Sequence, residues 1–239
     1  MDNNKPAYKR VLLKLSGEAL AGDKKFGIDF GTLENVCKVI KKCADTGVEI
    51  AIVVGGGNFW RGLKVEEGRM ERSRADHMGM LATVMNAVAV ADALEQAGAN
   101  ASVQTAFSME VVADRYTRRG AEKQLSDGGI IVFGCGTGSP YFSTDTGAVL
   151  RAAEIGADVI LLAKNIDAVY SADPQIDASA IKYDHIKYND MLMQHLTVMD
   201  MTATSLAMEN KIPVLLFALK DPENIYRAIM GEKIGTVID

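Results

Sequence analysis

The sequence predicts an α/β fold, a three-layer αβα sandwich with a central, mostly parallel sheet. Short runs rich in Val, Ile and Leu alternate with longer helical patterns along the chain. This alternation is typical of a parallel sheet with helices on both sides. Several of the runs are apolar almost throughout, as expected of strands that are covered on both faces. No repeat or linker interrupts the pattern, so we expect a single domain over residues 1–239.

The expected elements follow from where the apolar runs and the helical periodicity fall. The expected strands are Val11–Leu15, Glu49–Val54, Ala101–Ala106, Ile130–Gly134, Asp158–Ala163 and Pro213–Phe217. The expected helices between them are Thr32–Asp45, Arg74–Ala97, Ser108–Leu125, Asp145–Ile155, Asp190–Asn210 (as two helices) and Pro222–Met230. In such sheets ligands bind beyond the carboxyl ends of the strands. Residues that directly follow a strand are therefore candidate site residues.

Composition excludes several classes of protein. The chain has 26 Lys and Arg against 31 Asp and Glu, a formal net charge of −5. This balance argues against nucleic acid or an anionic membrane as the main partner, because both favour an excess of cations. Three cysteines without CxxC spacing imply neither a disulfide framework nor a zinc site. The start is too polar for a signal peptide, and no apolar run reaches about 18 residues. We therefore expect a cytoplasmic protein.

Two glycine-containing segments follow the first two strands. Lys14–Gly17 places a mobile cation beside exposed backbone N–H groups, which are the parts of a phosphate site. Gly55–Gly57 is costly in chain entropy, so it indicates close backbone approach, and Arg61 adds a planar cation. Trp60 stands where a dinucleotide fingerprint needs its third glycine, and no Walker A motif occurs. Ordinary turns are the alternative in both places.

Further candidates follow later strands or open a helix. The segment 134–145 is dense in glycine and hydroxyl groups and leads into a helix, so it can bind a sugar or phosphate or simply cap that helix. Asp76 can accept hydrogen bonds from vicinal sugar hydroxyls, or can satisfy a helix dipole. The stretch 164–174 suits a nucleotide but is also compatible with a solvated loop. The long helix, with Met78, Met80 and Met85, carries enough apolar surface to predict a subunit interface.

Six segments share their residues and their order with one known family. They are YKRVLLKLSGEAL at 8–20, VVGGGNFWRG at 53–62, DHMGMLATVMNA at 76–87, GTGSPYFSTD at 136–145, VYSADP at 169–174 and MGEKIGT near the end. Together they resemble the bacterial uridylate (UMP) kinases of the amino acid kinase superfamily, over essentially the whole chain. The segments at 76–87 and 136–145 resemble the uridylate branch rather than the branches that phosphorylate amino acids.

The resemblance implies transfer of the γ-phosphoryl group of ATP to UMP with Mg²⁺, giving UDP and ADP in pyrimidine nucleotide biosynthesis. It implies an acceptor-binding part over about residues 1–160 and an ATP-binding part over about 161–239. It also implies a homohexamer, with GTP and UTP as possible effectors that act through the segment 22–29. Lys24 and Lys25 depart from the residues common in that segment.

The resemblance assigns roles residue by residue but names no metal ligands. The implied catalytic residues are Lys14, Arg61 and Asp145. The implied ATP-binding residues are Lys14, Leu15, Ser16, Gly17, Gly57, Arg61, Asn165, Tyr170 and Asp173. The implied UMP-binding residues are Gly56, Asp76, Thr137, Gly138, Ser139, Pro140, Tyr141, Phe142, Ser143 and Thr144. Lys164 stands beside Asn165, and either of the two can face ATP.

Two other functions stay open. One is a kinase of the same fold with another acceptor, such as aspartate, glutamate or acetylglutamate. A fixed carboxylate at Asp76 disfavours these acidic acceptors, whereas ribose hydroxyls would donate to it. The other is a non-catalytic nucleotide sensor. The presence of both Lys14 and Arg61 argues against a sensor, because binding alone can manage with fewer cations.

Overall fold

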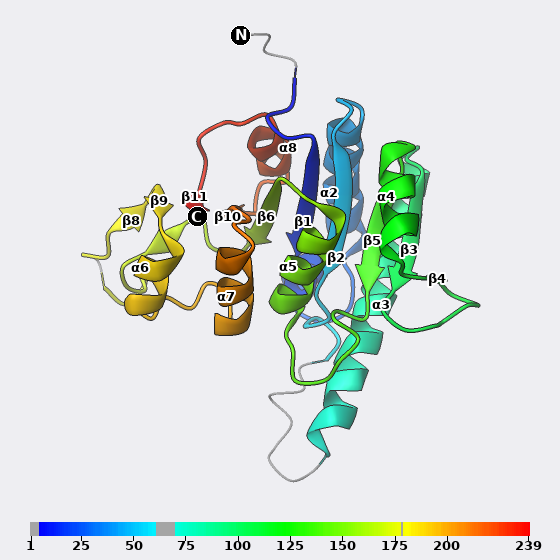
Figure 1. Ribbon diagram of the computed structural model, residues 1–239, viewed down its shortest axis with the longest axis horizontal. Helices are drawn as coiled ribbons and strands as arrows, with labels where there is room; N and C mark the ends of the chain where they lie inside the picture. The colour runs from blue at the N-terminus through cyan, green and yellow to red at the C-terminus, as the bar shows by residue number, and fades with distance from the viewer. Residues whose placement is uncertain (1–4, 61–69, 178) are drawn as a thin grey trace.

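A computed structural model describes residues 5–60, 70–177 and 179–239. Within these residues a nine-stranded sheet runs through the centre, with helices on both faces (Figure 1). The strand order is β4-β3-β5-β2-β1-β6-β10-β11-β9, and its pairs are parallel except for the antiparallel pair of β10 and β11. The predicted fold class, a three-layer sandwich around a mostly parallel sheet, is confirmed.

The six predicted strands all form, each within one residue of its expected ends. They are β1 (Arg10–Leu15), β2 (Glu49–Val54), β3 (Ala101–Thr105), β5 (Ile130–Gly134), β6 (Val159–Lys164) and β10 (Val214–Ala218). Short strands that the sequence analysis does not predict are β4 (Asp114–Arg115), β7 (Val169–Tyr170), β8 (Lys182–Tyr183), β9 (His185–Ile186) and β11 (Thr236–Ile238). These have two or three residues, too few for an apolar alternation to show.

Most predicted helices are also confirmed. The helices α2 (Phe30–Ala44), α3 (Arg72–Gln96), α5 (Thr144–Ile155) and α8 (Glu223–Ile229) lie within two residues of the expected ends. The stretch expected to hold two helices holds α6 (Tyr188–Met193) and α7 (Met201–Glu209). A short helix α1 (Gly17–Ala21) and the 3₁₀ helix η1 (Gly22–Lys24) follow β1 and were not expected.

The prediction of one helix over Ser108–Leu125 is wrong. Only its second half is helical, as α4 (Arg118–Ser126), which begins where the Thr117 hydroxyl accepts a hydrogen bond from the Gly120 N–H at 3.2 Å. The first half turns through a bridge between Met109 and Ala113 and then pairs β4 with β3. Pairing with the sheet therefore outweighs the local helical pattern of this segment.

The two faces of the sheet contact different helices. In β1, Leu13 and its neighbours Val11 and Leu15 belong to a core with residues of α2, α3 and α8. Leu12 points to the opposite side and belongs to a second core with residues of α4, α5, α6 and α7. In Figure 1, α5 and α7 accordingly lie in front of the sheet, and α2 and α8 lie behind it. Alternate residues of one apolar strand thus contribute to the cores on both faces of the sheet.

Helix α3 is, in the part of the chain that the structure describes, the one helix long and apolar enough to span a membrane by length and composition. Its most apolar window is 56% buried within the protein, and the helix packs against β2, β3 and β5. Burial of this kind is typical of a core helix. The N-terminal end of α3 projects beyond the sheet at the bottom of Figure 1.

The carboxyl ends of the parallel strands bring the glycine-containing segments together. β1 lies between β2 and β6, so the chain turns in opposite directions on its two sides, which is where open α/β sheets bind ligands. A Cβ atom on Gly17 would lie 2.6 Å from the Gly55 carbonyl oxygen. The loops after β1 and β2 can therefore approach each other this closely only because residue 17 is glycine.

Candidate active site

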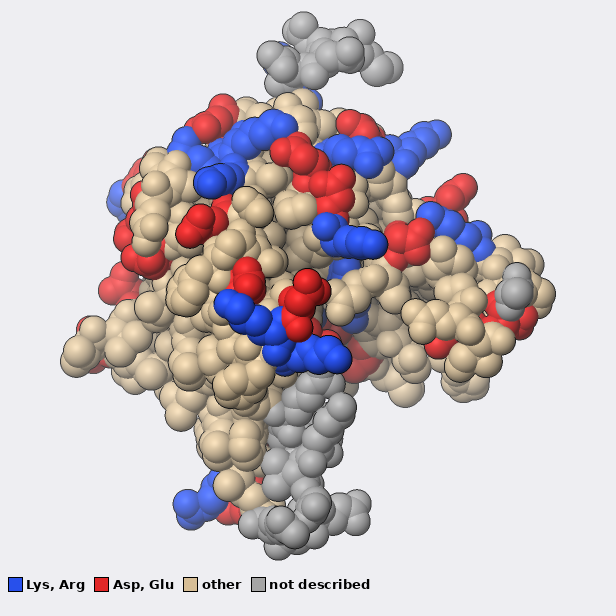
Figure 2. Space-filling model, turned by 180° about the vertical axis from the view of Figure 1, so that it is seen from behind, with Lys and Arg blue, Asp and Glu red and all other residues tan. Residues whose placement is uncertain are grey.

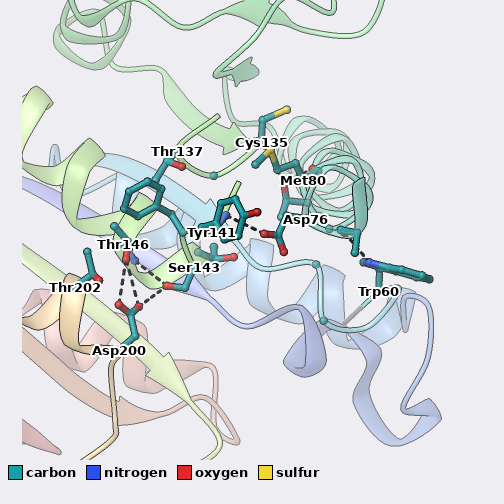
Figure 3. Close-up of a pocket in the computed structure, with 18 of the residues that line it drawn as sticks. Trp60, Asp76, Met80, Cys135, Thr137, Tyr141, Ser143, Thr146, Asp200 and Thr202 are labelled. Atoms are coloured by element: carbon teal, nitrogen blue, oxygen red, sulfur yellow. Dashed lines mark hydrogen bonds between the residues drawn. The ribbon is translucent and has the colours of Figure 1, made fainter. Parts of the chain in front are cut away.

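A cavity of about 790 Å³ opens at this edge of the sheet. Its walls come from the loops after β2 and β5, the first turns of α3 and α5, and the start of α7 (Figure 3). The UMP-assigned residues that line it are Gly56, Asp76, Thr137, Tyr141, Phe142, Ser143 and Thr144. Gly138, Ser139 and Pro140 belong to the same loop but are not part of the wall. Residues distant in sequence thus share one nucleotide-sized cavity.

Three buried or half-buried charges meet where β1, α5 and β6 converge. The Lys14 Nζ lies 2.8 Å from Asp145 Oδ1, and the Lys164 Nζ donates to Asp145 Oδ2 at 3.4 Å. Lys164 also donates to the Val198 carbonyl oxygen, just before α7. A carboxylate therefore holds two ammonium groups side by side at the strand ends, an arrangement suited to anionic oxygens.

Burial and charge act on this cluster in opposite directions. Burial alone would raise the pKa of Asp145, but the charges of Lys14 and Lys164 outweigh it and hold the pKa below its usual value. Burial, together with the charge of Lys14, lowers the pKa of Lys164, although Asp145 partly offsets this. Asp145 is therefore a carboxylate, not a carboxylic acid, at neutral pH.

The N-terminus of α5 faces the cavity and is fixed by two residues. The Ser143 hydroxyl accepts from the Thr146 N–H at 3.1 Å and caps the helix. Asp200 accepts hydrogen bonds from the hydroxyls of Ser143 and Thr146, and also caps α7 by accepting from the Ala203 N–H at 3.0 Å. One carboxylate therefore joins the N-termini of α5 and α7, both of which carry partial positive charge.

Asp76 lies on the cavity wall, one turn inside α3. Its carboxylate accepts from the Tyr141 N–H at 2.8 Å (Figure 3). It also accepts from Arg72 Nε at 2.8 and 3.0 Å. The N-cap position of the helix is Glu71, not Asp76. The interpretation of Asp76 as a mere helix-start charge therefore does not describe its contacts, since they join α3 to the loop after β5.

The glycine loop after β2 is held from behind by two buried asparagines. The Asn86 side chain donates to the Gly55 carbonyl at 2.7 Å, and the Asn58 side chain donates to the Gly27 carbonyl at 2.7 Å. The two amides also bond to each other. A Cβ on Gly56 would lie 2.8 Å from the Gly79 carbonyl oxygen, so this loop packs directly on the backbone of α3.

The ATP-assigned residues are spread along the same edge. Lys14, Leu15, Ser16 and Gly17 form the end of β1 and the start of α1, and Gly57 lines the large cavity. Arg61 lies outside the described residues. Asn165, Tyr170 and Asp173 line neither cavity, but the Tyr170 hydroxyl donates to Asp167 at 3.0 Å. Asp167 borders a second cavity of about 300 Å³ with Lys182, Asn224 and Arg227.

A sequence profile of the amino acid kinase family matches residues 9–218. The chain belongs to the amino acid kinase family. This confirms the family resemblance of the motifs and agrees with the nine-stranded architecture.

Solved structures place this amino acid kinase more narrowly. A UMP kinase from Bacillus anthracis has a TM-score of 0.94 and 38% identity, covering 97% of this chain and 96% of that one. A UMP kinase from Ureaplasma parvum has a TM-score of 0.91 and 36% identity, covering 97% and 98%. A uridylate kinase from Archaeoglobus fulgidus has a TM-score of 0.73 and 30% identity, covering 96% and 99%. The likeness thus extends over the full fold.

The motifs of this amino acid kinase left several cavity residues unassigned. Lys164, not Asn165, is the residue that reaches Asp145. Arg72, Thr146 and Asp200 make the contacts that fix the cavity wall. The sequence does point to Lys164, because a lysine at the end of a buried strand needs a carboxylate partner close by. Nothing in the sequence points to Asp200, since its partner Thr146 lies 54 residues away along the chain.

The buried cluster predicts a pH-dependent stability. Asp145→Asn leaves two neighbouring ammonium groups without their carboxylate and should lower the free energy of unfolding at pH 7 by about 3 kcal/mol. The folded pKa of Asp145 lies below its unfolded value of about 4. The contribution of Asp145 is therefore full above that value and is lost as the pH falls through the folded pKa.

Urea unfolding at pH 7 and at about pH 3 tests this expectation, and the gap between wild type and Asp145→Asn should narrow at the lower pH. Asp45→Asn is the matched control, because it breaks the exposed pair with Lys41 and should change little. An equal and small loss of the free energy of unfolding in both variants would contradict the assigned role of Asp145.

Proposed function

We propose that this chain transfers the γ-phosphoryl group of ATP to UMP, giving UDP and ADP in pyrimidine nucleotide biosynthesis. The observation that carries the proposal is one cavity with Asp76 on its wall and the Lys14–Asp145–Lys164 cluster at the adjoining strand ends. The similarity to proteins described as UMP kinases, at 36–38% identity over 97% of the chain, supports the same acceptor.

The acceptor nucleotide fits the large cavity. Asp76 Oδ1 accepts one hydrogen bond from the described residues and so retains capacity for a ribose hydroxyl. The acceptor phosphate lies toward the N-terminus of α5, whose partial positive charge favours an anion. The loop residues Thr137–Thr144 complete the UMP set, with Gly56 behind them.

The two lysines supply the electrostatics of the transfer. In-line phosphoryl transfer needs two phosphates held close together and their charge offset, rather than covalent chemistry by the protein. Lys14 and Lys164 place two cations at one point, and Asp145 holds them in position. No general base is required, because an oxygen of the UMP phosphate is already ionised. We assign Arg61 to the same phosphates.

Mg²⁺ is proposed to arrive with ATP. The described residues hold no cluster of three or more His, Cys, Asp or Glu side chains that could bind a metal by themselves. Mg²⁺ commonly uses one or two carboxylates together with substrate phosphates. Asp145 fits this pattern as a single carboxylate beside the two lysines at the strand ends. When bound, Mg²⁺ offsets phosphate charge.

The nucleotide part of ATP is proposed to bind on the β6–β10 side of the edge. There the smaller cavity combines Lys182, Arg227 and Lys233 with the Asn224 side chain. Tyr170 and Asp173, on the hairpin beside it, belong to the ATP set, as do Asn165 and the β1 end. An acceptor part over about residues 1–160 and an ATP part over about 161–239 follow, with one sheet shared by both.

A coupled ADP assay tests the function. We expect turnover with UMP, and much slower turnover with CMP, dTMP, AMP, aspartate and glutamate. An acidic amino acid as the best acceptor would reassign the chain to another branch of the family. Binding of ATP and UMP without ADP formation would indicate a nucleotide sensor.

Replacing Lys14 tests the charge cluster. Because Lys14 offsets charge that develops between donor and acceptor, Lys14→Ala should lower kcat by about 100-fold or more. The KM for UMP should change little. The control is Lys38→Ala, an exposed position on α2, which should keep wild-type kinetics. Near-normal turnover of Lys14→Ala would contradict the assignment.

Replacing Asp76 separates the two nucleotide sites. Asp76→Asn keeps the shape but weakens a charge-assisted acceptor, so the KM for UMP should rise by about 10- to 100-fold. The KM for ATP should stay within a few-fold. Discrimination against 2′-deoxy-UMP should fall, because that analogue lacks the hydroxyl concerned. Unchanged UMP kinetics with a lower melting temperature would leave Asp76 a purely structural role.

We also propose a homo-oligomer, as a hexamer, in the cytoplasm, with GTP and UTP as effectors. Met78, Leu81, Met85 and Val88 recur at helical spacing on α3 and are 38–53% exposed. Figure 2, a view from behind, shows charges of both signs over the upper part and few on the lower flank. Such an apolar stripe suits a subunit interface.

The effectors are assigned to the segment 22–29, which contacts the glycine loop through Asn58.

Light scattering at micromolar concentration tests the assembly. Wild-type protein should have a mass well above that of one chain. The double variant Leu81→Glu and Met85→Glu should shift it toward a monomer, because two charges would be buried in the interface. Lys38→Ala serves again as the control. A monomeric wild type would refute the interface.

A further inference from the structure

Arg72 lies at the mouth of the large cavity without an assigned role. Among the residues that the structure describes, no other Lys or Arg lines this cavity. The Arg72 Nε donates to both oxygens of Asp76, at 2.8 and 3.0 Å, from one turn earlier on α3. The side chain therefore fixes the direction of the carboxylate that the acceptor ribose is proposed to use.

The same guanidinium group contacts the loop on the opposite wall. Its Cζ lies 5.3 Å from the centre of the Tyr141 ring, within the range of a cation–π contact. The Tyr141 N–H donates to Asp76 Oδ2 at 2.8 Å. Arg72, Asp76 and Tyr141 thus form a closed set of contacts between α3 and the loop after β5. We call this set the latch.

The backbone of Tyr141 shows that the loop needs such an anchor. Its φ angle is 73°, in the left-handed region that residues with a side chain rarely adopt. A conformation of this kind persists only where surrounding contacts determine it. Two contacts between described residues help to determine it: the Tyr141 N–H donates to Asp76, and the Tyr141 ring contacts the Arg72 guanidinium group.

The latch leaves room for the substrate. A carboxylate has about four acceptor sites on its two oxygens. Asp76 Oδ2 accepts from Arg72 and from Tyr141, whereas Oδ1 accepts only from Arg72 among the described residues. A ribose hydroxyl can therefore bind at Oδ1 while the loop stays anchored at Oδ2, so the latch need not open when the acceptor enters.

We propose that Arg72 is a positioning residue of the acceptor site, acting through Asp76 and Tyr141 to hold the loop after β5 against α3 before a nucleotide binds. The proposal rests on the proposed function for its kinetic consequence. An acceptor that meets a preset wall loses less affinity to ordering the loop. Removal of Arg72 should therefore weaken UMP binding without slowing the transfer step.

The test compares Arg72→Met, which keeps the length of the side chain but not its charge, with Arg74→Met. Arg74 lies on the same helix, where its partner is Glu71 at the exposed end. For Arg72→Met we expect a KM for UMP about 10-fold higher, with kcat and the KM for ATP within twofold of wild type. Hydrogen exchange of the Tyr141 amide should be about 10-fold faster in the nucleotide-free variant. Arg74→Met should change none of these.

Combining Arg72→Met with Asp76→Asn decides whether Arg72 acts through Asp76. The double variant should have a KM well below the product of the two single effects, since one of the two residues through which Arg72 acts is already impaired. If the two substitutions raise the KM for UMP multiplicatively, Arg72 contacts UMP independently of Asp76, and the proposal is overturned. An unchanged Tyr141 amide in Arg72→Met would also overturn it. This exchange measurement needs no activity, so it tests the latch even if the wild type proves inactive toward UMP.

Discussion

A buried carboxylate shared by two lysines is the constraint on which the site depends. Asp145 sits at the start of α5, Lys14 at the end of β1 and Lys164 at the end of β6. Charges removed from water are costly unless they are paired, so none of the three elements can shift alone without leaving a charge uncompensated. The parallel pairing of β1 with β6 brings the lysines to the same edge. Electrostatics then sets the position of α5 relative to the sheet.

Further contacts extend from this cluster to the acceptor wall. Lys164 holds the backbone at Val198, two residues before Asp200, and Asp200 in turn holds Ser143 and Thr146 at the start of α5. The loop that precedes α5 then reaches α3 through Tyr141 and Asp76. The Lys14–Asp145–Lys164 cluster and the Asp76 side of the cavity therefore belong to one continuous set of polar contacts.

The sequence predicts a feature when residues close together in the chain determine it. Central strands such as β1 and β2 were predictable because they are continuous apolar runs buried on both faces. β4 was not, because Asp114 and Arg115 become a strand only by pairing with β3. In the site, glycines and Asp76 stand out directly after strands or at a helix start. That Lys164 reaches Asp145 needed the direction in which its side chain leaves the end of β6. Asp200 acts through partners that only the fold brings near it, as does Arg72 in its contact with Tyr141.

The two edges of the nine-stranded sheet limit how copies of this protein can meet. The outermost strands, β4 and β9, have two residues each, and β4 consists of an aspartate and an arginine. Short, charged edge strands offer few free backbone groups to a neighbouring strand, so they resist extension of the sheet into aggregates. The helical layers carry no such row of backbone groups, so they present side chains rather than a strand edge to any neighbouring molecule.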